Sequence, residues 1–141
     1  MKAIHLLLLL VYLSISSVGY SQKDTTGKKD DLLFLLRQTE HIDQAIKTVA
    51  QIQANANTTL KPGNIVIVVC GEAVTKLGTE EAEQWVKKIK SQPHISILAC
   101  GLSLTKFNKS INDLAKGIGY TENGFVKAFE LQKEGYLSVE L

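Results

Sequence analysis

Two cysteines are the residues in this chain whose type and position are best suited to chemistry. Cys70 ends an apolar run rich in β-branched residues, Cys100 ends a second apolar run, and each is followed directly by a glycine, Gly71 or Gly101. An apolar run that stops at a glycine is typical of a buried strand leading into a tight turn. A thiol there lies at the carboxyl edge of a parallel sheet, where open α/β folds bind ligands. The same positions also suit cysteines that only pack the core, because free cysteine is among the most buried residue types.

Of the two, Cys100 is the better candidate for a reactive thiol. An amphipathic segment follows it, and we expect a helix that begins near Ser103. The partial positive charge at a helix N-terminus favours a thiolate over a thiol. Cys70 leads into a looser turn at Gly71 and Glu72, which we expect to form a second wall of the same site. The sequence therefore predicts Cys100 as the catalytic residue, with Cys70 and its turn beside it.

Two basic side chains, Arg37 and His41, follow the first expected strand and belong to the same predicted edge. A cationic neighbour stabilises a thiolate, so either residue would favour ionisation of a nearby thiol, although both positions also suit solvated surface residues. Gly101 completes the predicted binding residues, because it forms the turn after Cys100.

The two cysteines also allow one disulfide bond, if the chain is exported to an oxidising compartment. Both end strand-like runs, where a structural disulfide is unusual. We therefore favour thiols, or a functional redox pair of Cys70 and Cys100, over a structural bridge. Strand order is not fixed by the sequence, so the distance between the two thiols stays open.

Several kinds of site are missing from the sequence. No Gly-x-Gly-x-x-Gly follows the first expected strand and no Walker loop occurs, so no nucleotide cofactor is expected. The chain has 3 histidines, none spaced with the cysteines as metal ligands are, so no metal is expected. The 16 Lys and Arg against 14 Asp and Glu give a net charge of +2, which provides no electrostatic footprint for nucleic acid.

The N-terminal segment has the features of a secretory signal peptide. A short basic start precedes a leucine-rich stretch too short to span a bilayer comfortably, and small residues stand at Gly19 and Ser21. We expect residues 1–21 to be the signal peptide, 22–30 a disordered leader and 31–141 a single domain. The mature protein is then periplasmic or secreted and has no membrane segment.

Strand-like and helix-like segments alternate along the rest of the chain. We expect strands at 32–36, 65–70, 95–100, 118–120 and 136–140, the last of them an edge strand. Helical periodicity predicts helices at 39–52, 79–90 and 123–134, and a further helix near 103–116 that carries Leu104, Phe107, Ile111 and Leu114 on one face. Short connections between alternating elements imply an α/β fold, a three-layer α/β/α sandwich with a mostly parallel five-stranded sheet.

Three segments in order resemble those of DsrE/DsrF-like proteins. They are the strand and Gly-containing turn at 65–74, the cysteine-bearing strand-to-helix turn at 97–104, and the closing Leu-Gln and Gly-Tyr pairs of 131–136. The resemblance spans 31–141. It implies the same three-layer fold, association into trimers or hexamers, and in some members a cysteine that carries sulfur as a persulfide. Only Cys100 maps onto that cysteine, and Cys70 stands where relatives often have another residue.

Two hypotheses of different classes follow. In the first, the protein is an exported sulfur carrier or sulfurtransferase accessory, with Cys100 as the carrier and a donor or acceptor protein as its partner. In the alternative, it is a non-catalytic oligomeric module in which Cys100 packs the core and the carboxyl-edge cleft binds a small ligand or partner. A dithiol redox protein that uses Cys70 and Cys100 is a third option. Thiol pKa and accessibility distinguish the first from the second.

Overall fold

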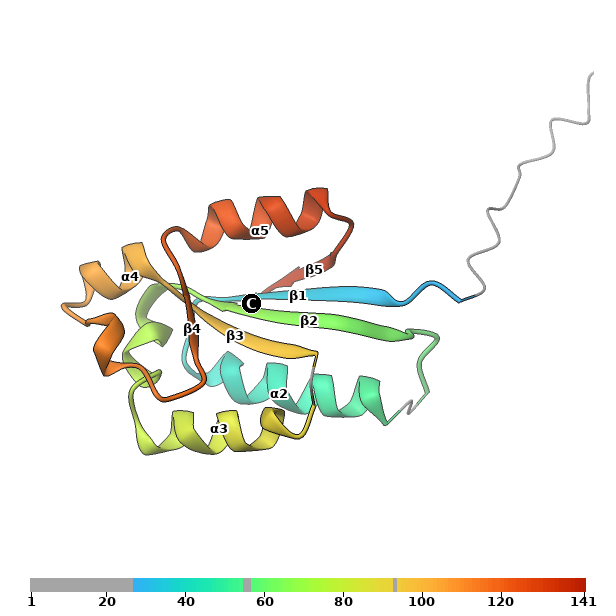
Figure 1. Cartoon of the computed structure of the whole chain (residues 1–141), viewed down its shortest axis with the longest axis horizontal. Coiled ribbons are helices and arrows are strands. Elements are labelled where there is room, and N and C mark those ends of the chain that lie inside the picture. The colour runs from blue at the N-terminus through green and yellow to red at the C-terminus, as the bar shows by residue number, and fades with distance from the viewer. Residues whose placement is uncertain (1–26, 55–56, 93) are drawn as a thin grey trace, which may run out of the picture.

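The part of the chain that the structure describes forms one twisted sheet of five strands, all parallel, in the order β4-β3-β2-β1-β5 (Figure 1). The computed structural model describes residues 27–54, 57–92 and 94–141. The predicted α/β class is confirmed, and the sheet is parallel throughout rather than mostly. The strands are β1 (Asp30–Leu36), β2 (Pro62–Val69), β3 (Ile95–Cys100), β4 (Gly119–Thr121) and β5 (Leu137–Glu140).

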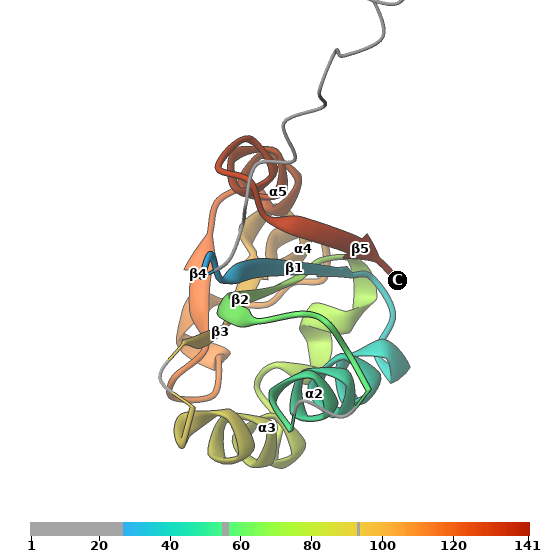
Figure 2. The same ribbon diagram turned by 90° about the vertical axis from the view of Figure 1, so that its right-hand side faces the viewer.

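Helices cover both faces of this sheet, which gives the predicted three layers. Figures 1 and 2 show α2 and α3 side by side on one face and α5 on the other. The helices are α2 (Glu40–Gln53), α3 (Glu80–Lys90), α4 (Gly101–Lys106) and α5 (Gly124–Lys133), with the 3₁₀ turns η1 (Gly71–Lys76) and η2 (Ile111–Asp113). The expected signal peptide at 1–21 and most of the expected leader lie outside the described residues.

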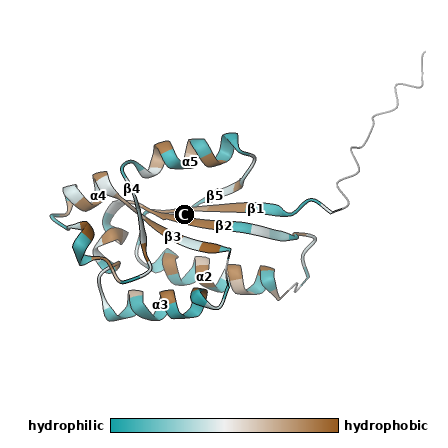
Figure 3. Cartoon of the chain, in the orientation of Figure 1, coloured by the Kyte–Doolittle hydropathy of each residue, from teal (hydrophilic) through white to brown (hydrophobic). Residues whose placement is uncertain are grey.

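Strand residues alternate between two separate cores, as the period of two requires. On β1, Leu32, Phe34 and Leu36 face α2 and α3, whereas Leu33 and Leu35 face α5. In Figure 3, β1 and β2 are apolar (brown) over their buried parts and polar only at their starts, as expected for strands buried on both faces. Both cysteines belong to the smaller core, under α5.

The larger core is held by the stripes of α2 and α3. Trp85 of α3 is buried, and its indole N–H donates a hydrogen bond of 2.9 Å to Asp43 of α2. A buried indole needs such a partner for its polar atom. The residue therefore fixes one helix against the other and against the sheet.

The prediction of one helix near 103–116 is wrong. The structure has only α4, which ends at Lys106, and the separate 3₁₀ turn η2. Asn108 has a positive φ of 52°, and the Ser110 hydroxyl and Asp113 carboxylate cap η2 by accepting backbone N–H groups. Such local side-chain bonds compete with helix continuation, and they leave Ile111 exposed rather than on a core-facing stripe.

Candidate functional site

Cys70 and Cys100 lie side by side at the carboxyl edge of the two central strands. β2 and β3 pair in parallel with Val69 opposite Ala99, and Cys70 and Cys100 are the residues that directly follow this pair. Both side chains point to the face under α5, each is only 1% exposed, and neither forms a disulfide. The structure therefore brings together the two thiols whose separation the sequence left open.

The first residue of α5, Gly124, covers both sulfur atoms. Its backbone N–H donates a hydrogen bond of 3.2 Å to Cys100 Sγ. A Cβ at this position would collide with Cys70 Sγ and lie 3.1 Å from Cys100 Cβ. Glycine is needed here because the helix N-terminus approaches the thiols so closely. Asn123 fixes that N-terminus, since its side-chain oxygen accepts the N–H groups of Phe125 and Val126.

Ser103 of α4 connects the turns that follow the two cysteines. Its Oγ accepts a 2.9 Å hydrogen bond from the N–H of Gly71, the residue after Cys70. The hydroxyl and the backbone N–H of Ser103 also lower the pKa of Cys100. One serine therefore holds the turn after Cys70 and favours ionisation of Cys100.

These contacts set the ionisation of Cys100. Burial raises the pKa of its thiol, but the hydrogen bonds from Ser103 and Gly124, together with one from the Cys70 thiol, outweigh that effect. The net result is a Cys100 pKa below its ordinary value, since hydrogen bonds to the charged form favour it.

Cys70 has the opposite tendency. Burial, followed by the charge of Cys100 and the hydrogen bond that the Cys70 thiol donates to it, raises the pKa of Cys70 to about 12. Arg37 lowers the pKa of Cys70 and Glu140 raises it, both by smaller amounts. The pair thus divides its roles: Cys100 is the sulfur prone to ionise, and Cys70 is the one that keeps its proton.

Three of the predicted binding residues, Arg37, Gly71 and Glu72, line one cleft of about 460 Å³ at this edge. Arg37 forms an exposed ion pair of 3.6 Å with Glu140 at the end of β5. Gly71 has a φ of +58°, and a Cβ there would lie 2.8 Å from the Arg37 carbonyl oxygen. The turn after Cys70 is therefore packed directly against the turn after β1.

The other two predicted residues lie outside that cleft. Gly101 lies beneath the ring of Tyr120, because a Cβ there would be 2.7 Å from Tyr120 Cε2. His41 is in the first turn of α2, on the opposite face of the sheet from the thiols. The structure does not bring His41 to Cys70 or Cys100.

Comparison with known proteins identifies similar folds and no family. No family model matches the chain, and no curated protein matches it. Among solved structures, the chain is similar to MTH1491 from Methanobacterium thermoautotrophicum, a protein of unknown function, with a TM-score of 0.67 and 18% identity over 81% of this chain and 100% of that one. It is also similar to BT1422 from Bacteroides thetaiotaomicron, a conserved protein of unknown function, with a TM-score of 0.55 and 21% identity over 79% and 95% of the two chains. These likenesses establish the α/β fold.

The sequence pointed to Cys100 but not to two of the groups that act on it. The sequence predicted Ser103 only as the start of a helix. In the structure α4 begins at Gly101, so Ser103 lies in its first turn, near Cys100. Gly124 was expected only near the start of the last helix. The sequence Asn123-Gly124 could have indicated this role. A capping residue followed by glycine suggests that the start of the helix packs closely against another part of the chain.

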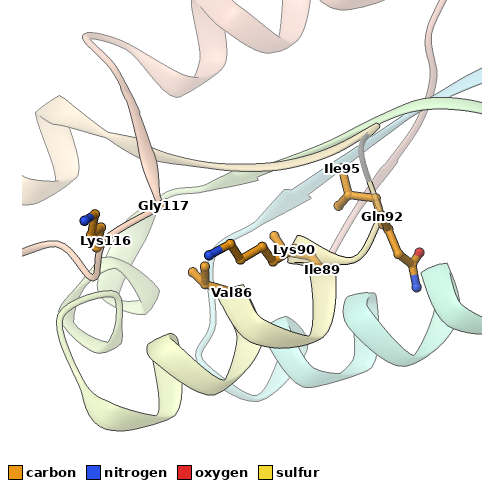
Figure 4. Close-up of a pocket in the computed structure, with 7 residues that line it drawn as sticks. All are labelled: Val86, Ile89, Lys90, Gln92, Ile95, Lys116 and Gly117. Atoms are coloured by element: carbon orange, nitrogen blue, oxygen red, sulfur yellow. The ribbon is translucent and has the colours of Figure 1, made fainter.

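A larger cavity of about 500 Å³ lies at the opposite edge of the sheet, by the start of β3 (Figure 4). It is lined by aliphatic side chains such as Val86 and Ile89 and by the amines of Lys90 and Lys116. It contains none of the predicted site residues, and the chemistry expected of the thiol pair is separate from it.

Within 27–54, 57–92 and 94–141, no group of three or more His, Cys, Asp or Glu side chains is arranged to hold a metal ion. In the same ranges, no helix has both the length and the apolar character needed to cross a membrane.

Proposed function

We propose that the protein is an exported DsrE/DsrF-like sulfur carrier, or an accessory to a sulfurtransferase, that holds sulfur as a persulfide on Cys100. The observation that carries this proposal is the hydrogen bond from the Gly124 N–H to Cys100 Sγ, at a sulfur whose pKa Ser103 and Cys70 lower as well. Such donors favour the anion of Cys100, and the thiolate is the form that a nucleophilic cysteine requires.

The loading step follows from these contacts. The Cys100 thiolate attacks the terminal sulfur of a donor such as an inorganic polysulfide. A bond forms between Cys100 Sγ and that sulfur, the bond to the rest of the donor breaks, and the shortened polysulfide leaves with the electron pair. Ser103 and Gly124 stabilise the negative charge on Cys100 before the attack, which lowers the cost of forming the nucleophile.

Access to Cys100 requires the start of α5 to move, because Gly124 covers a sulfur that is 1% exposed. The first turn of α5 is held by the Asn123 cap and by the Gly124 contact with Cys100. Local opening of such a turn costs less free energy than global unfolding. A small anionic donor is therefore the substrate class that we propose.

The test is loading with inorganic polysulfide followed by intact-protein and peptide mass spectrometry. The wild-type protein and Cys70→Ala are expected to gain sulfur at Cys100, a mass of ~32 Da per sulfur atom. Cys100→Ala is expected to gain none at its remaining cysteine. Equal loading of Cys100→Ala and Cys70→Ala would contradict the assignment of the carrier residue.

The alternative, a non-catalytic binding module, is favoured by one observation. The carboxyl-edge cleft beside Arg37 and Glu72 is open, whereas both thiols are buried. In this function the cleft, whose walls carry the cations of Arg37 and Lys106 and the carboxylates of Glu72 and Glu140, binds a small zwitterionic ligand. Ligand binding that survives Cys100→Ala and is lost in Arg37→Ala would support it.

Export and self-association complete the proposal. The signal-like segment at 1–21 supports a periplasmic or secreted protein, and the resemblance at 31–141 supports trimers or hexamers with a sulfur donor or acceptor protein as a further partner.

A further inference from the structure

Cys70 lies where it could form a disulfide with Cys100, which a carrier with a single cysteine does not need. The two cysteines follow paired residues of adjacent parallel strands and point to the same face. Neighbouring strands lie about 4.8 Å apart, and a disulfide needs Cα atoms roughly 4.4–6.8 Å apart with both Cβ atoms on one side. Gly124 packs against both cysteine side chains, since a Cβ there would collide with Cys70 Sγ and lie 3.1 Å from Cys100 Cβ. The geometry for a bond between the two sulfur atoms is therefore nearly in place.

We propose that Cys70 is the resolving thiol of the carrier: it attacks sulfur-loaded Cys100, forms a Cys70–Cys100 disulfide and releases the carried sulfur as hydrosulfide. This inference rests on the proposed function and adds to it the product, inorganic sulfide, and the co-substrate, a dithiol reductant. The protein then acts as a catalyst that converts sulfane sulfur and a dithiol into sulfide and a disulfide.

The step balances in atoms and electrons. Cys70 Sγ forms a bond to Cys100 Sγ, and the bond between Cys100 Sγ and the terminal sulfur breaks. The terminal sulfur takes the electron pair and is reduced to hydrosulfide, while the Cys70 thiol is oxidised to half of the disulfide. The proton of Cys70 leaves with the hydrosulfide. A dithiol such as dithiothreitol then reduces the disulfide by two exchange steps and restores both thiols.

The contacts also explain why the two cysteines act in order. In the unloaded protein, the charge of Cys100 and the hydrogen bond to it are two of the three main causes that keep Cys70 protonated. Loading sulfur onto Cys100 moves the negative charge from Sγ to the terminal sulfur and makes Sγ an electrophile bonded to a leaving group. Cys70 can therefore attack Sγ only after Cys100 has been loaded.

The experiment follows a single turnover in the wild-type protein, Cys70→Ala, Cys70→Ser and Cys100→Ala. Each reduced protein is loaded briefly with inorganic polysulfide, desalted, and sampled over time for intact mass and for free sulfide. In Cys70→Ala and Cys70→Ser the added ~32 Da is expected to persist. In the wild type it is expected to disappear, leaving a protein about 2 Da lighter than the reduced form, with about one sulfide released per chain.

The outcomes separate this inference from the function on which it rests. If no variant that keeps Cys100 gains sulfur, the proposed function fails. If wild type and Cys70→Ala keep the added sulfur equally long, the carrier stands and the resolving role of Cys70 is overturned. If circular dichroism shows that the Cys70 variants do not fold, the inference is tested in the wild-type protein alone. Mild oxidation with diamide followed by peptide mapping must then yield a linked Cys70–Cys100 peptide, and failure to form that link overturns the inference.

Discussion

At the scale of single residues, the chemistry of Cys100 depends on a few hydrogen-bond donors rather than on a nearby cation. Arg37 acts on Cys70, and His41 lies on the other face of the sheet. The Ser103 hydroxyl and the Gly124 N–H contact the sulfur itself. Neutral donors therefore lower the pKa of Cys100 inside a small apolar core.

Replacing Ser103 by alanine tests the largest of these donors. A hydrogen bond to a charged group stabilises that group, so Ser103→Ala is expected to raise the pKa of Cys100 toward its ordinary value. The measurement is the iodoacetamide alkylation rate of Cys100 against pH in a Cys70→Ala background. The matched control is Ser96→Ala, which replaces an exposed serine on β3, the strand of Cys100. It should leave the dependence of the alkylation rate on pH unchanged.

The two thiols also predict how stability depends on pH. The pKa of Cys100 is lowered by folding, so the unfolded chain binds more protons below the ordinary value of 9.0 and stability rises as pH climbs toward it. The pKa of Cys70 is raised to about 12, so above 9.0 the folded chain holds the extra proton and stability falls. Urea unfolding at a series of pH values should show a maximum near pH 9 in the difference between the wild type and the Cys70→Ala/Cys100→Ala double variant. A flat difference would contradict the opposed ionisation of the pair.

At the scale of elements, the start of α5 is the part that controls the site. Gly124→Ala would place a methyl group against Cys70 Sγ and Val68, and overpacking of this kind costs roughly 1–3 kcal/mol. We expect a lower free energy of unfolding in urea. In the double variant Gly124→Ala/Cys70→Ala the sulfur is gone, so most of the loss should be recovered. A loss that persists in the double variant would point to backbone strain in α5 instead.

Periodicity predicted most of the elements because their apolar residues are spaced by the core that they face. The stripe of Ile42, Ala45, Ile46 and Val49 marked α2, and the β-branched run marked β2. The segment after Lys106 could not be predicted in this way, since Ser110 and Asp113 form a local cap that overrides the apolar spacing.

The candidate site was predictable only in part. Cys100 and Cys70 were visible as strand ends, but their contact depends on β2 and β3 being neighbours, and strand order is a property of the whole sheet. The role of Gly124 was hidden for the same reason, because α5 is distant in sequence from β2 and reaches the thiols only through the fold.

At the scale of the whole molecule, α5 has an unusual outer face for a helix in a single folded chain. Phe125, Val126 and Phe129 are exposed there, Phe129 by 69%, beside the buried Ala128 and Leu131 that hold the helix to the sheet. A second copy of this chain is the partner that the proposed self-association supplies for this face.

Self-association through α5 predicts that a charge on its outer face will separate the subunits. Phe129→Glu is expected to shift the light-scattering mass at micromolar concentration from a multiple of the chain to a single chain, because a buried carboxylate in the interface is costly. Lys133→Gln changes the net charge by the same amount on the same helix and should leave the assembly intact. A wild-type protein that is already a single chain would remove this part of the account.

The most direct test of the central claim compares alkylation of Cys100 in the folded and the denatured protein, in a Cys70→Ala variant that leaves one thiol to follow. The account predicts that the folded protein reacts and that its rate titrates with a pKa below 9.0, whereas the denatured protein titrates near 9.0. A Cys100 that stays unmodified at every pH while the protein is folded, and reacts freely once it is denatured, would contradict the carrier function. Cys100 would then be a packing residue, and the binding module would be the function that remains.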